Sequence, residues 1–321
     1  MAASSDTTTE SKAVEKRPRK LAKRKNTDKW GYFFVAPFFI FFLIFNFYPM
    51  FYTIYLSFTD LAGWATEANF VGLQNYTRLL DNELYRNSVV NTLILWIINF
   101  IPQIILAFLL AYWFTNRRLN LKGKGFFKSM FYLPNIITAA SVALIFRSLF
   151  SYPRGPLNLI MLDWGLISTP VDFYRSVFST RMIVSFIQFW MWYGQTSIVL
   201  QAGILGIDEN LFDAARVDGA TDWQSFTKIT MPLMKPITLY VLVTSLIGGL
   251  QIFDIPYLLT GGGPAQSVET MMIFIYKQAF QGGRNLNVAS TASVFLLIMT
   301  AVISLLIFNS FRERSTKKGA K

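Results

Sequence analysis

The chain contains 321 residues, of which 53% are hydrophobic and 15% are charged, with a mean hydropathy of +0.39. Soluble domains are usually about 45–50% apolar and about 25% charged. The absence of cysteine and histidine excludes disulfides, metal sites with Cys or His ligands, and catalysis by a Ser-His-Asp or Cys-His nucleophile.

The polar N-terminal segment 1–29 is rich in lysine and predicts a disordered cytoplasmic tail that fixes topology and contacts anionic lipid. A partner-binding role is the alternative. The segment 30–59 is too long and too aromatic for the apolar region of a signal peptide, which has about 7–15 residues. It should therefore remain as a first transmembrane helix, followed by an extracellular loop over 60–86.

Six stretches without Asp, Glu, Lys or Arg, the first of them already described, predict transmembrane helices, because a helix needs about 20 mostly apolar residues to cross a bilayer. Six such helices in a soluble protein would need a very large core. We therefore predict an all-α, polytopic membrane protein with six transmembrane helices. The stretches are 30–59, 87–116, 129–146, 182–207, 236–253 and 285–311.

The distribution of Lys and Arg predicts the orientation of the chain. With the N-terminus in the cytoplasm, the inner segments contain 22 Lys and Arg and 10 acidic residues, whereas the outer segments contain 8 of each. The net charge of +12 therefore follows from topology and gives no support to nucleic-acid binding. Both termini should be cytoplasmic. The inner segments are 1–29, 117–128, 208–235 and 312–321, the last being a cytoplasmic tail.

The inner loop 208–235 predicts two short helices rather than a plain connector. The stretch Glu209–Asp218 contains good helix formers, and Gly219 suits the left-handed position that ends a helix. Thr221 and Gln224 have the spacing of a capping box, so a second helix should begin there.

This second helix should end before Pro232, because a proline disfavours the helical conformation of the residue before it, Met231. The loop is also unusually acidic for the positively charged side of a membrane protein. We expect it to dock on a cytoplasmic partner with a basic or grooved surface. The acidic residues are Asp208, Glu209, Asp213, Asp218 and Asp222.

The same loop closely resembles the EAA loop of the membrane subunits of binding-protein-dependent ABC importers. In that motif EAA is followed by three residues, Gly, nine residues, Ile, one residue and Leu-Pro, and every spacing is kept here. Asp213 replaces Glu with a shorter reach, and Met231 replaces Leu with little change in volume. The resemblance implies contact with an ATPase for Asp213, Ala214, Ala215, Asp218, Gly219, Ala220, Ile229 and Pro232.

The resemblance extends from Trp30 onward. The segments YFFVAPFFIFFLIFNFYPMFYTIYLSF and FVGLQNYTRLL are similar to those of maltose F-type and multiple-sugar permeases. LLTGGGPAQSVETMMIFIYKQAF resembles a stretch typical of the oligosaccharide branch. Taken alone, the glycines of this stretch would indicate only a flexible turn. The resemblance implies a type I importer fold with a core permease domain over 87–311.

Several properties follow from the resemblance as expectations. The chain should be a transport subunit, not an enzyme, in a prokaryotic plasma membrane. It should pair with a second permease subunit, two ATP-binding subunits and an extracellular sugar-binding protein, and move an oligosaccharide by alternating access. No GxxxxGK[ST] loop is present, so we expect no cofactor in this chain, with ATP and Mg bound by the partner subunits.

Polar residues of the fourth stretch predict a substrate pathway. Gln188, Trp192 and Gln195 are spaced by four and three residues, which places them on one helical face. The resemblance to the maltose permease implies sugar contacts for these three and for Ser245, Gly248, Gly249 and Ile252. Helix packing is the alternative for these polar and small residues, especially the two glycines.

Three other classes of membrane protein fit the sequence less well. An ion-coupled secondary carrier would need charges inside the membrane, and these stretches have almost none. A permease of the same superfamily for another small solute is disfavoured by the GGGP segment (261–264) and by the Trp and Gln residues. A membrane enzyme is disfavoured by the lack of His, Cys and paired carboxylates. The role of Asp254, at the outer end of the fifth stretch, is left open.

Overall fold

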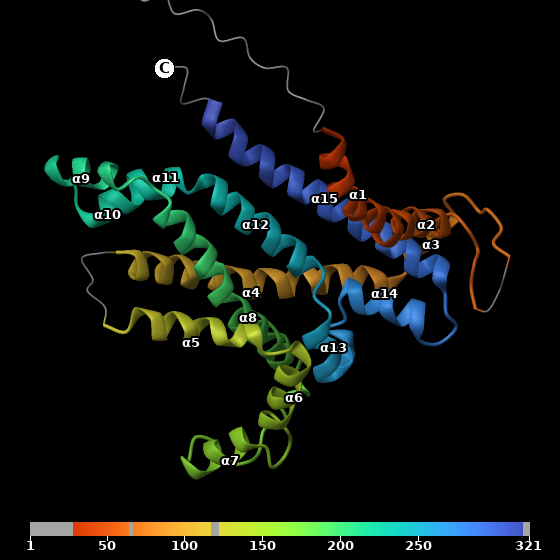
Figure 1. Cartoon of the computed structure of the whole chain (residues 1–321). Helices are drawn as coiled ribbons and strands as arrows, with labels where there is room; N and C mark the ends of the chain where they lie inside the picture. Colours follow the sequence, from red (N-terminus) through yellow and green to blue (C-terminus); the bar gives the residue numbers. More distant parts are fainter. Residues whose placement is uncertain (1–27, 64–66, 117–121, 317–321) are drawn as a thin grey trace, which may run out of the picture. The chain divides into compact units, whose positions relative to one another are not determined.

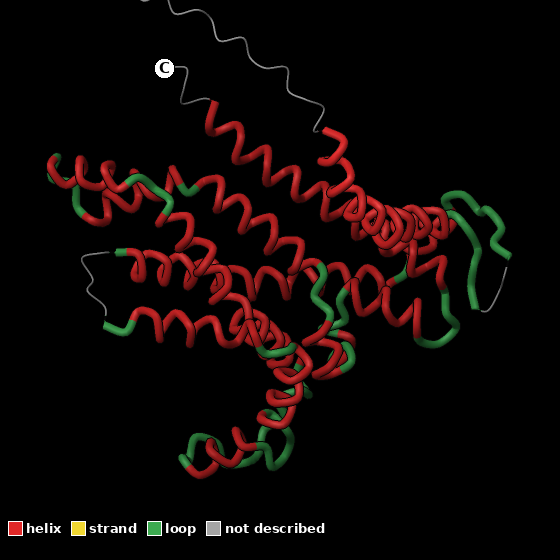
Figure 2. Tube along the Cα trace, viewed as in Figure 1, coloured by secondary structure: helices red, strands yellow, loops and turns green. Residues whose placement is uncertain are grey.

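The computed structural model describes residues 28–63, 67–116 and 122–316. These residues form helices joined by loops, and none of them belongs to a β-strand longer than a single bridge (Figures 1 and 2). The tail predicted for 1–29 lies outside the described residues except for its last two. The chain divides into two compact units, Met1–Phe51 and Tyr52–Lys321, and each is described by itself.

The described part of the first unit is a single helical stretch with exposed aromatic side chains. It contains α1 (Asp28–Phe42), the π-helix η1 (Leu43–Phe47) and the beginning of α2 (Tyr48–Ser57). Phe38 stacks on Phe42 with ring centroids 6.2 Å apart, and the neighbouring rings are exposed on all sides. A helix that is apolar all round suits a lipid environment.

The second unit contains the remaining helices. In chain order they are α3 (Gln74–Asp81), α4 (Glu83–Thr115), α5 (Lys124–Ile136), α6 (Ala139–Leu149), α7 (Pro156–Asp163), α8 (Val177–Leu205), α9 (Glu209–Val217), α10 (Asp222–Ser225), η2 (Phe226–Thr230), α11 (Met231–Leu233), α12 (Lys235–Leu250), α13 (Asp254–Thr260), η3 (Pro264–Gln266), α14 (Met271–Phe280) and α15 (Leu286–Thr316).

Local sequence explains where several of these helices begin. Asn82 accepts a hydrogen bond from the backbone N–H of Tyr85 at the start of α4. Thr138 and Thr270 do the same for the first turns of α6 and α14. Short polar side chains in these positions satisfy backbone groups that lack an intrahelical partner.

The centre of the second unit is the pair α4 and α8, which pack against each other, with α5 on α8 and α12 against α4, α8 and α15 (Figure 1). Gly194 permits the close approach of α5 to α8, because a Cβ there would overlap the carbonyl of Phe131. Small residues in this role are common where helices cross in membranes.

Replacing Gly194 with leucine should therefore prevent the α5–α8 contact and lower the yield and thermal stability of the solubilised permease. The obstacle is backbone, which cannot rotate away as a side chain would. Thermal unfolding followed by circular dichroism measures the effect. Gly125→Leu is the matched control, since a Cβ at Gly125 in α5 meets no atom within 4 Å. Equal melting temperatures for the two variants would contradict this account.

Most predicted transmembrane stretches correspond to helices. Among the described residues, four helices are long and apolar enough to cross a membrane: Trp30–Ser57, Glu83–Thr115, Lys235–Thr260 and Leu286–Phe311. The fourth predicted stretch is α8, a helix of 29 residues, which is not among these four. Its glutamine, serine and threonine side chains lower its hydropathy. The count of six spans and the cytoplasmic position of both termini remain predictions.

The third predicted stretch, 129–146, is not one continuous helix. α5 and α6 meet at an angle of 91°, and Ile137 and Thr138 between them have extended backbone. Pro134 removes one hydrogen bond from the last turn of α5, and Thr138 caps the next helix. These two local signals end one helix and start another, which the uncharged composition of the stretch did not reveal.

Candidate functional site

A cavity lies among α4, α8 and α12. The space between these helices, including its opening to solvent, is about 810 Å³. Its lining residues are Asn99, Gln103, Gln188, Trp192, Gln195, Thr196, Val199, Tyr240, Val241, Thr244, Ser245, Gly248, Gly249 and Ile252.

All seven residues predicted for the substrate pathway line this cavity. Three come from α8, three from α12, and Ile252 follows the end of α12. Gln188 is buried at 9% exposure, whereas Trp192 is 48% exposed. One amide is thus held in the wall while the indole is open to the cavity. Trp190 lies elsewhere and packs edge-on against Phe146, as expected for a residue off the predicted face.

Sequence reasoning missed the contribution of α4. Gln103 donates a hydrogen bond from Nε2 to Oγ1 of Thr196 at 2.8 Å, and Asn99 donates from Nδ2 to the carbonyl of Leu95 at 2.9 Å. Each amide nitrogen therefore uses one of its two N–H groups within the protein. The signal was present, because two amides four residues apart in an apolar span share a face.

The two predicted glycines have different surroundings. A Cβ at Gly249 would overlap the indole of Trp96, whereas a Cβ at Gly248 would meet no atom within 4 Å. Gly249 is buried and Gly248 is exposed. Gly249 thus serves helix packing, the alternative considered above, and Gly248 leaves open space at the cavity wall.

A second region of interest is the loop from α9 to α11. Asp208 caps α9, its carboxylate accepting from the backbone N–H of Asn210 at 3.0 Å. Gly219 has φ +77°, and its N–H and that of Ala220 donate to the carbonyls of Arg216 and Ala215. This is the pair of bonds that closes a helix through a left-handed residue, so the predicted role of Gly219 in ending the helix is confirmed.

The capping box at the start of α10 is also confirmed. The backbone N–H of Gln224 donates to Oγ1 of Thr221 at 3.2 Å, and that of Thr221 donates to Oε1 of Gln224 at 2.8 Å. The ring of Phe226 then packs against Tyr112 of α4 with centroids 4.9 Å apart. This contact attaches the loop to the helices below it.

The predicted end of the second helix was wrong. Met231 has helical φ and ψ, and α11 runs from Met231 to Leu233 with Pro232 in its first turn. The preceding π-helical turn explains this, since the N–H of Met231 donates to the carbonyl of Phe226, five residues back. The wider turn moves the chain before the proline ring, and proline is tolerated in a first turn.

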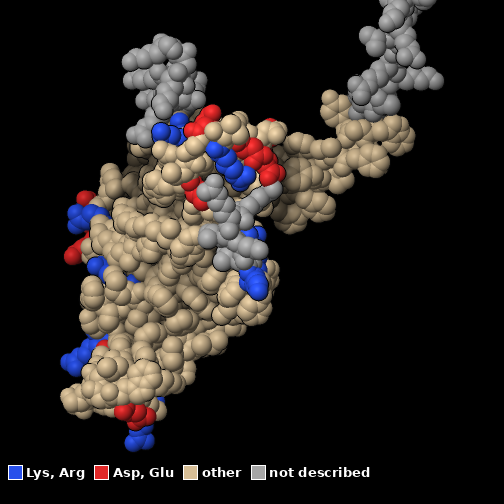
Figure 3. All heavy atoms as spheres, turned by 90° about the vertical axis from the view of Figure 1, so that its left-hand side faces the viewer, with Lys and Arg blue, Asp and Glu red and all other residues tan. Residues whose placement is uncertain are grey.

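The predicted contact residues of α9 lie at the surface. Asp213 and Ala214 are exposed, and Ala215 is half-buried. Asp213 already pairs with Arg216 at 2.8 Å, with both side chains about half exposed, and such a pair contributes little to stability. Figure 3 shows acidic and basic side chains close together on this face, around which much of the surface is uncharged. An exposed helix of this kind is accessible to a partner.

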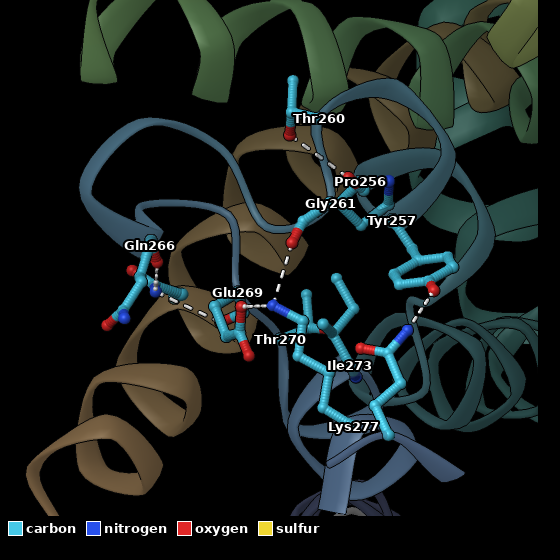
Figure 4. A network of polar contacts seen from close by, with 11 residues as sticks. Pro256, Tyr257, Thr260, Gly261, Gln266, Glu269, Thr270, Ile273 and Lys277 are labelled. Carbon is cyan, nitrogen blue, oxygen red and sulfur yellow. Dashed lines mark hydrogen bonds and ion pairs between the residues drawn. The ribbon is translucent and has the colours of Figure 1, made fainter.

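The GGGP segment is held by an ion pair whose carboxylate is buried and whose lysine is partly exposed. Lys277 donates from Nζ to Oε2 of Glu269 at 2.6 Å and to the carbonyl of Gly261 at 2.9 Å (Figure 4). Glu269 is only 1% exposed. Gly262 has φ +120°, and a Cβ there would overlap the carboxylate of Glu269. The segment is therefore a defined structure and not a flexible turn.

The same segment is joined to α4 and α8. Arg181 donates from Nη2 to Oδ1 of Asn91 at 2.7 Å and from Nε to the carbonyl of Ser267 at 3.0 Å. Oγ1 of Thr270 donates to the carbonyl of Ile252, a cavity residue, at 2.6 Å. Asp254, whose role was left open, is exposed in the first turn of α13. Sequence reasoning did not find this network.

Comparison with known proteins shows what the chain is similar to. A family model described as binding-protein-dependent transport system inner membrane component matches residues 76–314. The lactose transport system permease protein LacF of Rhizobium radiobacter is 32% identical over 289 residues, which cover 89% of this chain and 95% of LacF. The sn-glycerol-3-phosphate transport system permease protein UgpA of Agrobacterium fabrum is 30% identical, covering 86% of this chain and 92% of UgpA.

A solved structure agrees with these relatives. It is that of a bacterial alginate ABC transporter in complex with an alginate pentasaccharide-bound periplasmic protein. One of its chains superposes with a TM-score of 0.78 at 27% identity, covering 93% of this chain and 99% of that chain. The predicted all-α importer-permease fold is thereby confirmed.

Proposed function

Since this chain belongs to the family of inner membrane components of binding-protein-dependent transport systems, we propose that the cavity among α4, α8 and α12 is its part of the path of an oligosaccharide. The chain is a multi-pass permease subunit of an ABC importer of the inner membrane, a transport component and not an enzyme. The observation that supports the proposal most is the open indole of Trp192 among amide and hydroxyl groups.

The chemistry of the lining fits a sugar. The C–H face of a pyranose ring is apolar and packs on an aromatic ring, while its hydroxyls need hydrogen-bond partners. Trp192 offers the ring, and Gln188 and Gln195 flank it on the same helical face. Polar groups in an apolar surrounding are costly unless they have partners, which favours a ligand role for amides that point into the cavity.

Transport needs further subunits in this proposal. ABC importer permeases work with partner subunits, and we assign here a second, different permease, two ATP-binding subunits and an extracellular sugar-binding protein. ATP and Mg belong to the ATP-binding subunits. The exposed helix α9 and the capped turn at Gly219 transmit their movement to the cavity, which then opens alternately to either side of the membrane.

The proposal predicts that the complete importer in proteoliposomes hydrolyses ATP faster, by about tenfold or more, when its binding protein and an oligosaccharide are present together. Omission of either component is the control. Native mass spectrometry of the same preparation should give one copy of this chain, one of another permease and two ATPases. Stimulation by a non-sugar solute alone, or a stable homodimer as the active permease, would refute the proposal.

A further inference from the structure

We infer that the oligosaccharide imported through this chain is uncharged, without carboxylate or phosphate groups at the part that enters the cavity. The inference deepens the function proposed above and rests on it. Family membership does not decide the charge, because the relatives include permeases named for sn-glycerol-3-phosphate and lactose and an importer of alginate.

The first observation is the composition of the cavity wall. Among the described residues, none that lines the cavity is charged. The charged residues of the three lining helices lie near their ends: Glu83 and Arg86 in α4, Arg181 in α8 and Lys235 in α12. Arg181 is seven residues from Gln188, which is about 10 Å along the helix.

Arg181 is also engaged elsewhere. Its guanidinium donates to Oδ1 of Asn91 and to the carbonyl of Ser267, so it is held at the GGGP segment. Lys277 is held there too, by Glu269 and by the carbonyl of Gly261. The two cations of this network are therefore used within the fold and are not directed to a ligand in the cavity.

The second observation is the polarity of the amides. Gln103 and Asn99 each donate one N–H, to Thr196 and to the carbonyl of Leu95, which leaves one N–H and the oxygen of each amide. A sugar hydroxyl donates to such an oxygen, whereas a carboxylate or phosphate has only acceptor oxygens at neutral pH. An anionic substituent could use only the remaining neutral N–H and hydroxyl donors, would lose its hydration and would find no cation in the wall, which is unfavourable in an apolar surrounding.

The test is saturation-transfer difference NMR, which detects weak ligands, on the permease complex with its partner subunits in nanodiscs. Leaving out the extracellular binding protein removes its own selectivity. Two probe pools of equal length are used: neutral gluco-, galacto- and arabino-trisaccharides, and trimers of galacturonate and mannuronate. We expect transfer to the neutral pool at concentrations at least tenfold lower than to the acidic pool, and loss of that transfer in Trp192→Ala.

A charge inserted into the wall should change the preference. Gln103→Lys should raise transfer to the acidic trimers and lower transfer to the neutral ones, whereas the same change at Gln74, exposed at the start of α3, should alter neither. Equal or stronger transfer to the acidic pool in the native complex would overturn this inference but not the proposed function. Neutral binding that does not depend on Trp192 would contradict the proposed sugar path through this cavity. Binding of neither pool would instead contradict the proposed function.

Discussion

Replacing Gly219 with valine is expected to separate the ATP-binding subunits from the permease and to abolish uptake. A non-glycine residue at φ +77° costs roughly 1–2 kcal/mol, and more when it is β-branched. The chain would relax by opening the turn between α9 and α10, which changes the face that α9 presents. Co-purification of the ATPase with the Gly219→Val permease, together with uptake in cells, measures the loss.

Two further variants separate backbone conformation from bulk. Gly219→Asn should retain more ATPase than Gly219→Val, because asparagine tolerates the left-handed region. Gly206→Ala, at the same side of the molecule but with φ −80°, should behave as the native protein. A Cβ at Gly219 meets no atom of this chain within 4 Å, so steric overlap within the permease cannot explain a loss. Full ATPase retention and normal uptake in Gly219→Val would rule out this coupling role.

Trp192→Ala is expected to reduce sugar uptake by roughly ten- to hundredfold while the complex still assembles. Removing the apolar surface on which a sugar ring packs costs about 1.5–3 kcal/mol, and each 1.4 kcal/mol corresponds to a factor of ten. Because nearly half of the side chain is exposed, few packing contacts are lost. Uptake at several sugar concentrations, with the amount of assembled complex determined in parallel, is the measurement.

The conservative variant distinguishes a ligand contact from a packing contact. Trp192→Phe keeps an aromatic face and should recover much of the uptake. Both variants keep the hydrogen bond from Oγ1 of Thr196, which goes to the backbone carbonyl of residue 192. If uptake and sugar-stimulated ATP hydrolysis stay at the native level in Trp192→Ala, the cavity is not the sugar path.

The sequence predicts the parts of the site that depend on neighbours along one helix. The spacing of Gln188, Trp192 and Gln195 places them on one face, and they do line one cavity. The left-handed turn at Gly219 and the capping box after it are likewise set by a few adjacent residues. These features could be predicted because a helix repeats every 3.6 residues and because glycine alone adopts φ > 0 readily.

The parts that depend on distant segments could not be predicted in this way. Nothing in the spacing of α4 shows that Gln103 meets Thr196, 93 residues later. Glu269 lies before Thr270, the N-cap of α14, so helical spacing does not show that its carboxylate meets Lys277 inside the helix. The bend at Ile137 and Thr138 was hidden for a different reason, since composition records apolarity and not direction.

The close contact at Gly194 has a mechanical consequence. Because the carbonyl of Phe131 lies directly against this glycine, α5 and α8 cannot slide past each other and move as one rigid body. Any rotation of α8 that changes the shape of the cavity must therefore move α5 as well. Hinges for such a movement then lie where the backbone leaves the helical conformation, at 137–138 and at 251–253. Between these hinges α6 packs on α13. Val142 of α6 and Ile255 of α13 also share a core cluster with Val184 of α8, so this pair is packed against the same rigid body.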